Sequence, residues 1–261
     1  MRADRIWEIA RKDMASVQRY RYVRLGLILM PLIFAVFIPL VLIYPVVAGE
    51  EAPKDNELPP FARPGMPSKE AMVAGLIDMA TLMFMVIPAA IPSTIASYTL
   101  VGEKVNRQLE PLLATPTTDL ELLMGKCMGA FIPTMLTTVA SFVVFILVVD
   151  FLTLPLFGHM ILPNLLSAVV LLVYAPLISL LSISWCVFIS SKVTDIRAAV
   201  QLGALGVLPL MAFYVLFVGG ILSLESLTLV AFALVLISAS AGLFALGKVT
   251  FQREKILTRW T

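Results

Sequence analysis

The chain has 261 residues, of which 60% are hydrophobic and 14% are charged, and its mean hydropathy is +0.97. Soluble globular proteins average about 45–50% apolar and about 25% charged residues, so these values exclude an ordinary soluble domain and indicate a chain that lies mainly in lipid. The formal net charge of +2 gives no concentrated basic surface, so we expect no nucleic-acid partner.

The first expected element is an amphipathic helix over residues 3–22. Its apolar residues recur at helical spacing, and its charged residues gather on the opposite face. The apolar set is Ile6, Ile9, Ala10, Met14 and Val17, and the charged set is Glu8, Arg11, Lys12 and Arg19. Such a helix lies in the membrane interface, with Trp7 and Tyr20 at headgroup depth. Its role is either to anchor the first span or to contact a partner.

Six apolar runs follow, each long enough to cross a bilayer as a helix, which needs about 20 residues. They cover residues 25–48, 71–100, 120–152, 162–190, 197–219 and 226–247. The runs are continuous and do not alternate, which favours helices over barrel strands. We predict an all-α polytopic membrane protein with six transmembrane helices, made of an interfacial segment (1–24) and one membrane domain (25–261).

The distribution of Lys and Arg predicts the orientation, because basic residues are retained in the cytoplasm. Sixteen of the 19 fall on one side of the predicted membrane, and the other three lie in the loop 49–70: Lys54, Arg63 and Lys69. Both termini are therefore expected in the cytoplasm of a multi-pass protein of the cell membrane. The loop 49–70 contains five prolines, which favour an extended outer connection.

Ionisable groups near the apolar runs are few. Asp78, Asp150 and His159 could form a cation path, but solvated carboxylates near the outer surface are the favoured interpretation. Asp150 and Glu225 are expected to be wetted. Met83, Phe84 and Met85 in the second run either line an apolar substrate path together with Asp78 or pack between helices. The stretch 198–247 leaves about ten residues beyond two spans, which could re-enter the membrane.

The residues needed for common enzyme chemistry are missing. The chain has one histidine and therefore no H-E-x-x-H, and it contains no G-x-S-x-G. A phosphate-binding loop is also missing: Gly125-Lys126 is the nearest fragment, but Leu120 stands where its first glycine should be. The two cysteines, Cys127 and Cys186, suggest neither a disulfide nor a metal cluster. We predict that this chain is not an enzyme and holds no cofactor or metal.

The polar segment between the second and third runs stands apart. It reads EKVNRQLEPLLATPTTDLELLMGK over residues 103–126. Pro111 suits the first turn of a short helix, and Thr115-Pro116 ends it, because the residue before a proline disfavours α geometry. Thr118 and Glu121 form a capping box that starts the third run. Such a short helix is suited to sit in the groove of another protein.

This segment resembles the signature of the type-2 permease family of ATP-binding-cassette (ABC) transporters. The matching residues are Glu103, Lys104, Leu109, Glu110, Leu112, Leu113, Ala114, Thr115, Pro116, Glu121, Leu122, Gly125 and Lys126. The family's layout also matches, with an amphipathic connecting helix, six spans and a cytoplasmic coupling helix after the second span, here residues 103–118. The family often has two re-entrant helices before its sixth span, for which this chain has little room.

The resemblance implies an exporter permease that docks a separate ABC ATPase, the subunit that binds ATP and magnesium. It further implies pairing with a second permease subunit, here expected as a homodimer embedded in membrane lipid. We expect the coupling residues to contact the ATPase: Glu103, Arg107, Leu109, Glu110, Leu112, Leu113 and Pro116. The scarcity of buried charge favours an amphipathic or apolar substrate.

Two other functions stay open from the residues alone. An ion-coupled secondary transporter would bury charges at mid-membrane in broken helices, and here little beyond Asp78 could serve. A non-transporting membrane scaffold or sensor could share the same fold.

Overall fold

The computed structural model describes residues 2–17, 21–49, 58–105, 118–190, 192–193 and 195–250. Within these residues every regular element is a helix, which confirms the predicted fold class. The elements are α1 (Ala3–Val17), α2 (Arg21–Leu32), the π-helix η1 (Ile33–Phe37), α3 (Ile38–Leu42), α4 (Tyr44–Ala48), α5 (Ser68–Met83), α6 (Val86–Val105), α8 (Asp119–Phe157), α9 (Leu165–Val169), the π-helix η3 (Val170–Tyr174), α10 (Ala175–Ser190), α11 (Ile196–Ala204), the 3-10 helix η4 (Leu205–Val207), α12 (Leu208–Val218) and α13 (Ser226–Thr250).

Six helical stretches of the described residues are long and apolar enough to cross a membrane, as predicted. They are Val23–Ala48, Ser68–Glu103, Leu120–Phe157, Leu165–Ser190, Ile196–Val218 and Ser226–Lys248. Most bounds lie within three residues of the predicted ones. The third span runs five residues further than predicted, through Pro155, and ends at Gly158, whose φ of 70° lies in the left-handed region that favours glycine.

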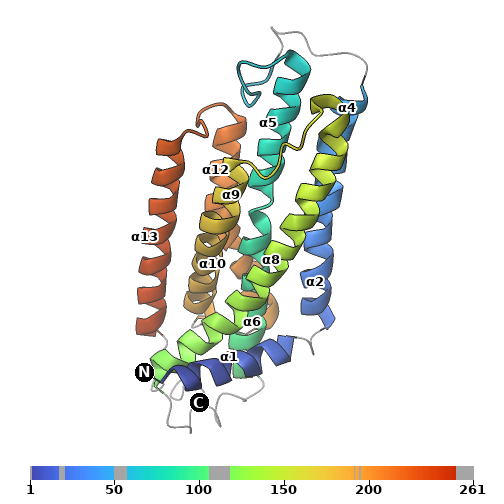
Figure 1. The fold of residues 1–261 in the computed structure, drawn as a ribbon. Coiled ribbons are helices and arrows are strands. Elements are labelled where there is room, and N and C mark those ends of the chain that lie inside the picture. The colour runs from blue at the N-terminus through green and yellow to red at the C-terminus, as the bar shows by residue number, and fades with distance from the viewer. Residues whose placement is uncertain are drawn as a thin grey trace.

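The spans form one bundle, and α1 crosses one end of it (Figure 1). We call this the α1 end, and the opposite end, where residues 58–67 lie, the loop end. The second span, α5 and α6, is buried along most of its length, whereas α13 has few fully buried residues and packs on α10. The second span is therefore the centre of the bundle.

The second span is broken near its middle, which the apolar pattern did not predict. α5 ends at Met83 and α6 begins at Val86, with Phe84 and Met85 in a turn between them. Pro88 has no N–H to donate to the carbonyl of Phe84, so the regular ladder cannot continue through this point. The break is a direct consequence of the local sequence.

A second proline in the same span creates a need for an outside hydrogen-bond donor. Pro92 cannot donate to the carbonyl of Pro88, the acceptor four residues before it. The Ser179 hydroxyl of α10 donates to this buried carbonyl over 3.0 Å. This bond links the second and fourth spans where the backbone of the second is incomplete.

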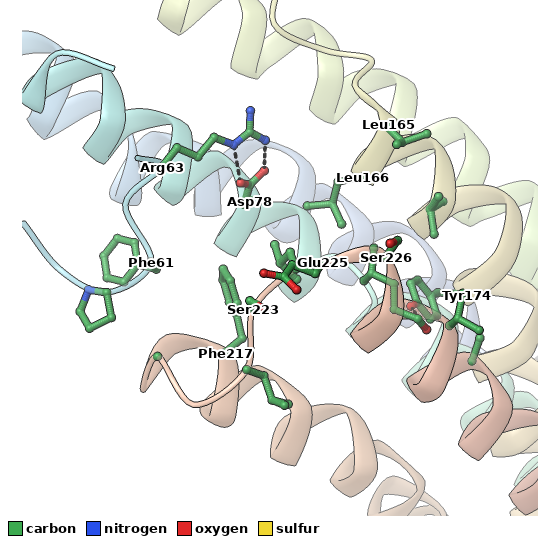
Figure 2. A pocket seen from close by; sticks show the side chains of 18 of the residues that line it. Phe61, Arg63, Asp78, Leu165, Leu166, Tyr174, Phe217, Ser223, Glu225 and Ser226 are labelled. Atoms are coloured by element: carbon green, nitrogen blue, oxygen red, sulfur yellow. Dashed lines mark hydrogen bonds and ion pairs between the residues drawn. The ribbon is translucent and has the colours of Figure 1, made fainter. Parts of the chain in front are cut away.

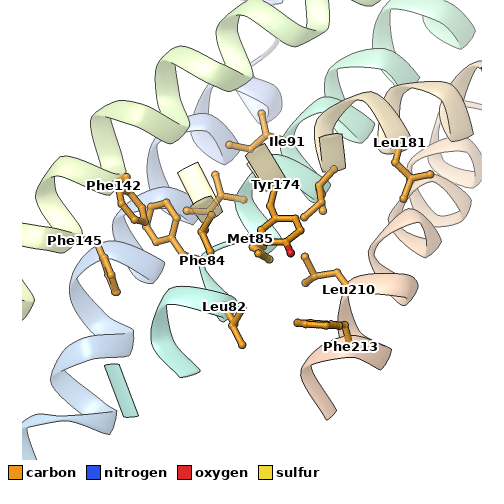
Figure 3. Close-up of a cluster of buried hydrophobic side chains, with 14 of the residues drawn as sticks. Leu82, Phe84, Met85, Ile91, Phe142, Phe145, Tyr174, Leu181, Leu210 and Phe213 are labelled. Atoms are coloured by element: carbon orange, nitrogen blue, oxygen red, sulfur yellow. The ribbon is translucent and has the colours of Figure 1, made fainter. Parts of the chain in front are cut away.

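Aromatic side chains fill the space around the break (Figure 3). The Phe84 ring lies 5.0 Å from the ring of Phe142 and 5.2 Å from that of Phe145, measured between centroids, and both partners belong to α8. On the other side of the core, the Tyr174 hydroxyl donates to the carbonyl of Leu229 over 2.7 Å. These ring contacts join the second span to the third, and the Tyr174 hydrogen bond joins the fourth span to the sixth.

The backbone bears on two expectations about the segments outside the spans, the connection before the sixth span and the N-terminal helix. Residues 219–225 connect α12 directly to α13 and form no helix, so the spare residues of this stretch do not build a re-entrant element. The N-terminal amphipathic helix is described over Ala3–Val17, residues 18–20 of the predicted range 3–22 lie outside the described residues, and the described chain resumes at Arg21 as the start of α2.

Candidate functional site

The first candidate site is a buried charge cluster at the α1 end. The Lys126 ammonium group lies 2.6 Å from a carboxylate oxygen of Glu103 and 3.4 Å from one of Asp13, and it donates to the carbonyl of Thr99 over 3.3 Å. Lys12 reaches the second oxygen of Glu103 over 3.0 Å. The Lys126 side chain is 1% exposed. Two cations and two carboxylates, from α1, α6 and α8, therefore balance in one place, which we call the α1-end cluster (Lys12, Asp13, Glu103 and Lys126).

Asp13 is the member of this cluster that has a buried oxygen without a hydrogen-bond partner among the described residues. Burial raises the pKa of its carboxyl group above the ordinary value, and the repulsion of Glu103 adds to this effect. The attraction of Lys126 and Lys12 acts in the opposite direction without cancelling it. Ionised Asp13 is tolerated here because Lys126 stands beside it.

Two glycines let α1 lie directly on α8. A Cβ atom added at Gly125 would come within 2.7 Å of the Ile9 side chain, and one added at Gly129 would come within 2.9 Å of Asp13. Small residues four apart on one helix face permit this close approach of two helices. The close approach is what brings Asp13 within reach of Lys126.

The start of α8 adds a further tie to α1. The predicted capping box is present: Glu121 N–H donates to the Thr118 hydroxyl, and Thr118 N–H donates to the Glu121 carboxylate. The backbone N–H of Arg2 also donates to Glu121 over 2.8 Å. Glu121, Gly125 and Lys126 of the quoted signature therefore all serve to fix α1 on the third span.

Of the predicted coupling residues, the structure describes only Glu103. Glu103 is buried in the α1-end cluster. The others lie outside the described residues: Arg107, Leu109, Glu110, Leu112, Leu113 and Pro116. Their contact with an ATPase stays a prediction, as does any role of Glu103 in it.

The second candidate site is a cavity of about 770 Å³ near the loop end (Figure 2). Its walls come from residues 60–64, the outer part of α5, the fourth span and the last two spans. Arg63 and Asp78 form a paired hydrogen bond in this wall: Nε donates over 2.8 Å and an Nη over 2.6 Å, one to each carboxylate oxygen. Glu225 also lines the cavity and is exposed.

The interpretation of Asp78 and Asp150 as solvated carboxylates is wrong. Asp78 is 5% exposed and is paired with Arg63, and Asp150 is 8% exposed and accepts from the backbone N–H groups of Ile161 and Leu162 over 3.1 and 3.0 Å. Glu225, by contrast, is exposed as expected. Loop segments that fold back onto the spans supply the partners that water was expected to supply.

The two predicted paths through the membrane differ from what the structure brings together. Asp78 lines the cavity, but neither Asp150 nor His159 does. Phe84 and Met85 are each 1% exposed and belong to the packed core, while Met83 is partly buried and does not line the cavity. This placement favours helix packing for Phe84 and Met85. No group of three metal-binding side chains occurs within the described ranges.

Three important residues lacked a functional prediction. Asp13 falls on the apolar face of α1, three positions after Ala10, and this placement was a usable signal for burial. Lys126 was matched only as part of a motif. Arg63 could not have been found, because a proline-rich loop separates it from Asp78 and no local pattern predicts how such a loop returns.

Comparison with known families agrees with these observations. No curated protein matches the chain. The family described as ABC-2 family transporter protein matches residues 7–231, which include most of α1, all of the first five spans and the beginning of α13. Permeases of this family work with ABC ATPase partners. The chain, with its six apolar spans, belongs to the ABC-2 family of transporter proteins.

Proposed function

We propose that this chain is the permease subunit of an ABC exporter that moves an amphipathic or apolar molecule out of the cytoplasm. In this proposal a separate ATPase subunit binds ATP and magnesium and docks on the coupling segment, residues 103–118. A second copy of the chain completes the membrane part. The protein lies in the cell membrane with both termini in the cytoplasm, on the side where 16 of its 19 basic residues fall.

The α1-end cluster is the observation that carries the proposal. Glu103 stands at the start of the coupling segment, and Lys126 stands in the first turns of the span that follows it. Their ion pair joins the two sides of the segment, and Asp13 adds α1 to the same unit. A push on the segment therefore moves the second span, the third span and α1 together, which is rigid-body coupling between discrete arrangements.

The break in the second span supports an ATP-driven transporter over an ion-driven one. Ion-coupled transporters place charged or polar ligands at such breaks. Here the break is surrounded by Phe84, Phe142 and Phe145, and all three are buried. The nearest acidic side chain along the span, Asp78, is paired with Arg63. Neither feature offers an unpaired charge that could hold a coupling ion at the break.

The test is a pull-down from solubilised membranes that compares the wild type with the double variant Glu110→Arg plus Leu113→Asp. We expect the wild type to retain an ABC ATPase and the double variant to lose it while it elutes as the same folded dimer. Glu51→Arg, in the predicted outer loop, is the matched charge-reversal control and should retain the ATPase. If no ATPase accompanies the wild type after crosslinking in intact cells, the proposal is refuted. Efflux that an uncoupler abolishes and ATP depletion leaves unchanged would also refute it.

A further inference from the structure

The cavity at the loop end has the size and lining of a binding site for a small organic molecule. Its volume of about 770 Å³ falls within the range of about 300–1,000 Å³ that is typical of ligand pockets. Most of its wall is apolar, with Leu166, Val173, Tyr174 and Phe217 among the lining residues. The body of a bound molecule would therefore lie against hydrocarbon and aromatic surface.

The polar groups of the wall leave one charge uncompensated. The Arg63 guanidinium group is engaged by both carboxylate oxygens of Asp78, so these two charges cancel. Glu225 forms no ion pair with any residue that the structure describes. Figure 2 shows Glu225 among the lining side chains, between the Arg63–Asp78 pair and Ser223. The lining thus carries a net charge of −1, located at Glu225.

The hydrogen-bond donors and cations near the cavity also favour a positively charged ligand over an anionic one. The Tyr174 hydroxyl is already used, because it donates to the carbonyl of Leu229. Lys69, the other described cation near the loop end, does not line the cavity, and it donates to the carbonyl of Gly49 over 2.6 Å. No free cation among the described lining residues is therefore available to hold an anionic ligand.

We propose that this cavity binds an amphipathic cation, with the apolar body against Leu166, Tyr174 and Phe217 and the positive group beside Glu225. This inference deepens the proposed transport function, on which it rests. In it, the cavity is a binding site near the loop end for a positively charged, largely apolar substrate. The Arg63–Asp78 pair fixes the loop residues that form one wall. Neutral apolar molecules of the same size bind more weakly, because they gain nothing from the carboxylate.

The test uses the purified permease in neutral maltoside micelles, without any ATPase. Equilibrium dialysis measures binding of radiolabelled tetraphenylphosphonium, with empty micelles as the blank, and tetraphenylborate is the anion of matched shape. Glu225→Gln should weaken binding of the cation about two- to fivefold, as expected for loss of one exposed ion pair. Glu70→Gln removes a carboxylate that does not line the cavity and should leave binding unchanged.

A second pair of variants tests the cavity itself. Val230→Trp fills it from α13 and should abolish binding of the cation, while Val235→Trp, at an equally exposed position of α13 outside the lining, should not. Equal binding by Glu225→Gln and the wild type, or equal affinity for tetraphenylborate, would overturn the inference. Both results are independent of the ATPase pull-down, so failure of the binding site and failure of the transport assignment remain distinguishable.

Discussion

The ammonium group of Lys126 lies 2.6 Å from the carboxylate of Glu103, in a position from which water is excluded. The two residues are 23 positions apart, and the residues between them include most of the predicted coupling segment. Because a buried charge is costly without its partner, the end of the second span and the start of the third cannot separate without exposing both groups. This pair makes the α1 end of the bundle act as one body.

Removal of Lys126 should therefore weaken the fold strongly. Lys126→Met leaves Glu103 and Asp13 buried without their shared cation, and breaking a buried pair in this way costs about 3–5 kcal/mol. We expect a clear fall in the thermal unfolding temperature of the purified protein. Combining Lys126→Met with Asp13→Leu and Glu103→Met should recover much of the loss, because no uncompensated charge then remains in the core.

Lys248→Met is the control for this series, since Lys248 is an exposed lysine in the last turn of α13. It should shift the unfolding temperature little. An equal effect of Lys126→Met and Lys248→Met would show that the α1-end cluster contributes nothing to stability.

The contact between α1 and α8 should depend on the absence of a side chain at Gly125. Gly125→Ala places a methyl group 2.7 Å from Ile9, and overpacking of this kind costs about 1–3 kcal/mol. We expect faster amide hydrogen exchange throughout α1. Gly242→Ala, where an added Cβ meets nothing within 4 Å, provides the matched control and should leave exchange in α1 unchanged.

The contribution of Asp13 to the docking of α1 should weaken as pH rises from the acidic side. The pKa of Asp13 is raised in the folded protein, so the folded state holds this proton more tightly than the unfolded chain does. The resulting stabilisation is complete below the ordinary pKa of Asp and is lost as pH rises through the raised value. The measurement is the difference in protease resistance of α1 between the wild type and Asp13→Asn from pH 4 to 7, because this difference isolates the contribution of Asp13. The advantage of the wild type should fall as pH rises, and a difference that does not change with pH would contradict the prediction.

A serine and a proline in neighbouring spans should show coupled effects. Ser179→Ala leaves the buried carbonyl of Pro88 without a donor, at a cost of about 1–3 kcal/mol. Pro92→Ala supplies a backbone N–H that can donate to the same carbonyl, so Ser179→Ala should cost much less in that background. A double-mutant cycle on thermal unfolding measures this coupling, and strictly additive effects would contradict it.

The spans were predictable because a membrane imposes a simple rule of length and hydropathy, and each of the six runs obeys it. The capping box at Thr118 and Glu121 was predictable for a similar reason, since its partners lie three residues apart. Features of this kind depend on neighbours along the chain. The break at Phe84 belongs with them, because Pro88 and Pro92 were visible in the sequence and only their effect was overlooked.

The partners of buried charges were not predictable in this way. Asp78 pairs with a residue of a proline-rich loop, and Asp150 accepts from backbone groups of residues 161–162. Both contacts depend on how a connection folds back onto its span, which neither composition nor periodicity encodes. Asp13 and Lys126 lie 113 positions apart in the chain, and their contact was not predictable for the same reason.

The separation of Asp13 and Lys126 along the chain also orders events during synthesis. α1 leaves the ribosome before the spans, with an acidic side chain on the face that will later be buried, and the cation that pairs with it is made only after two complete spans and the coupling segment. Until then α1 can rest on the membrane surface but cannot lock onto the bundle. The helix α1 is therefore made before the spans but is fixed in place only after the third of them, so its attachment reports that the third span has been inserted in the correct register.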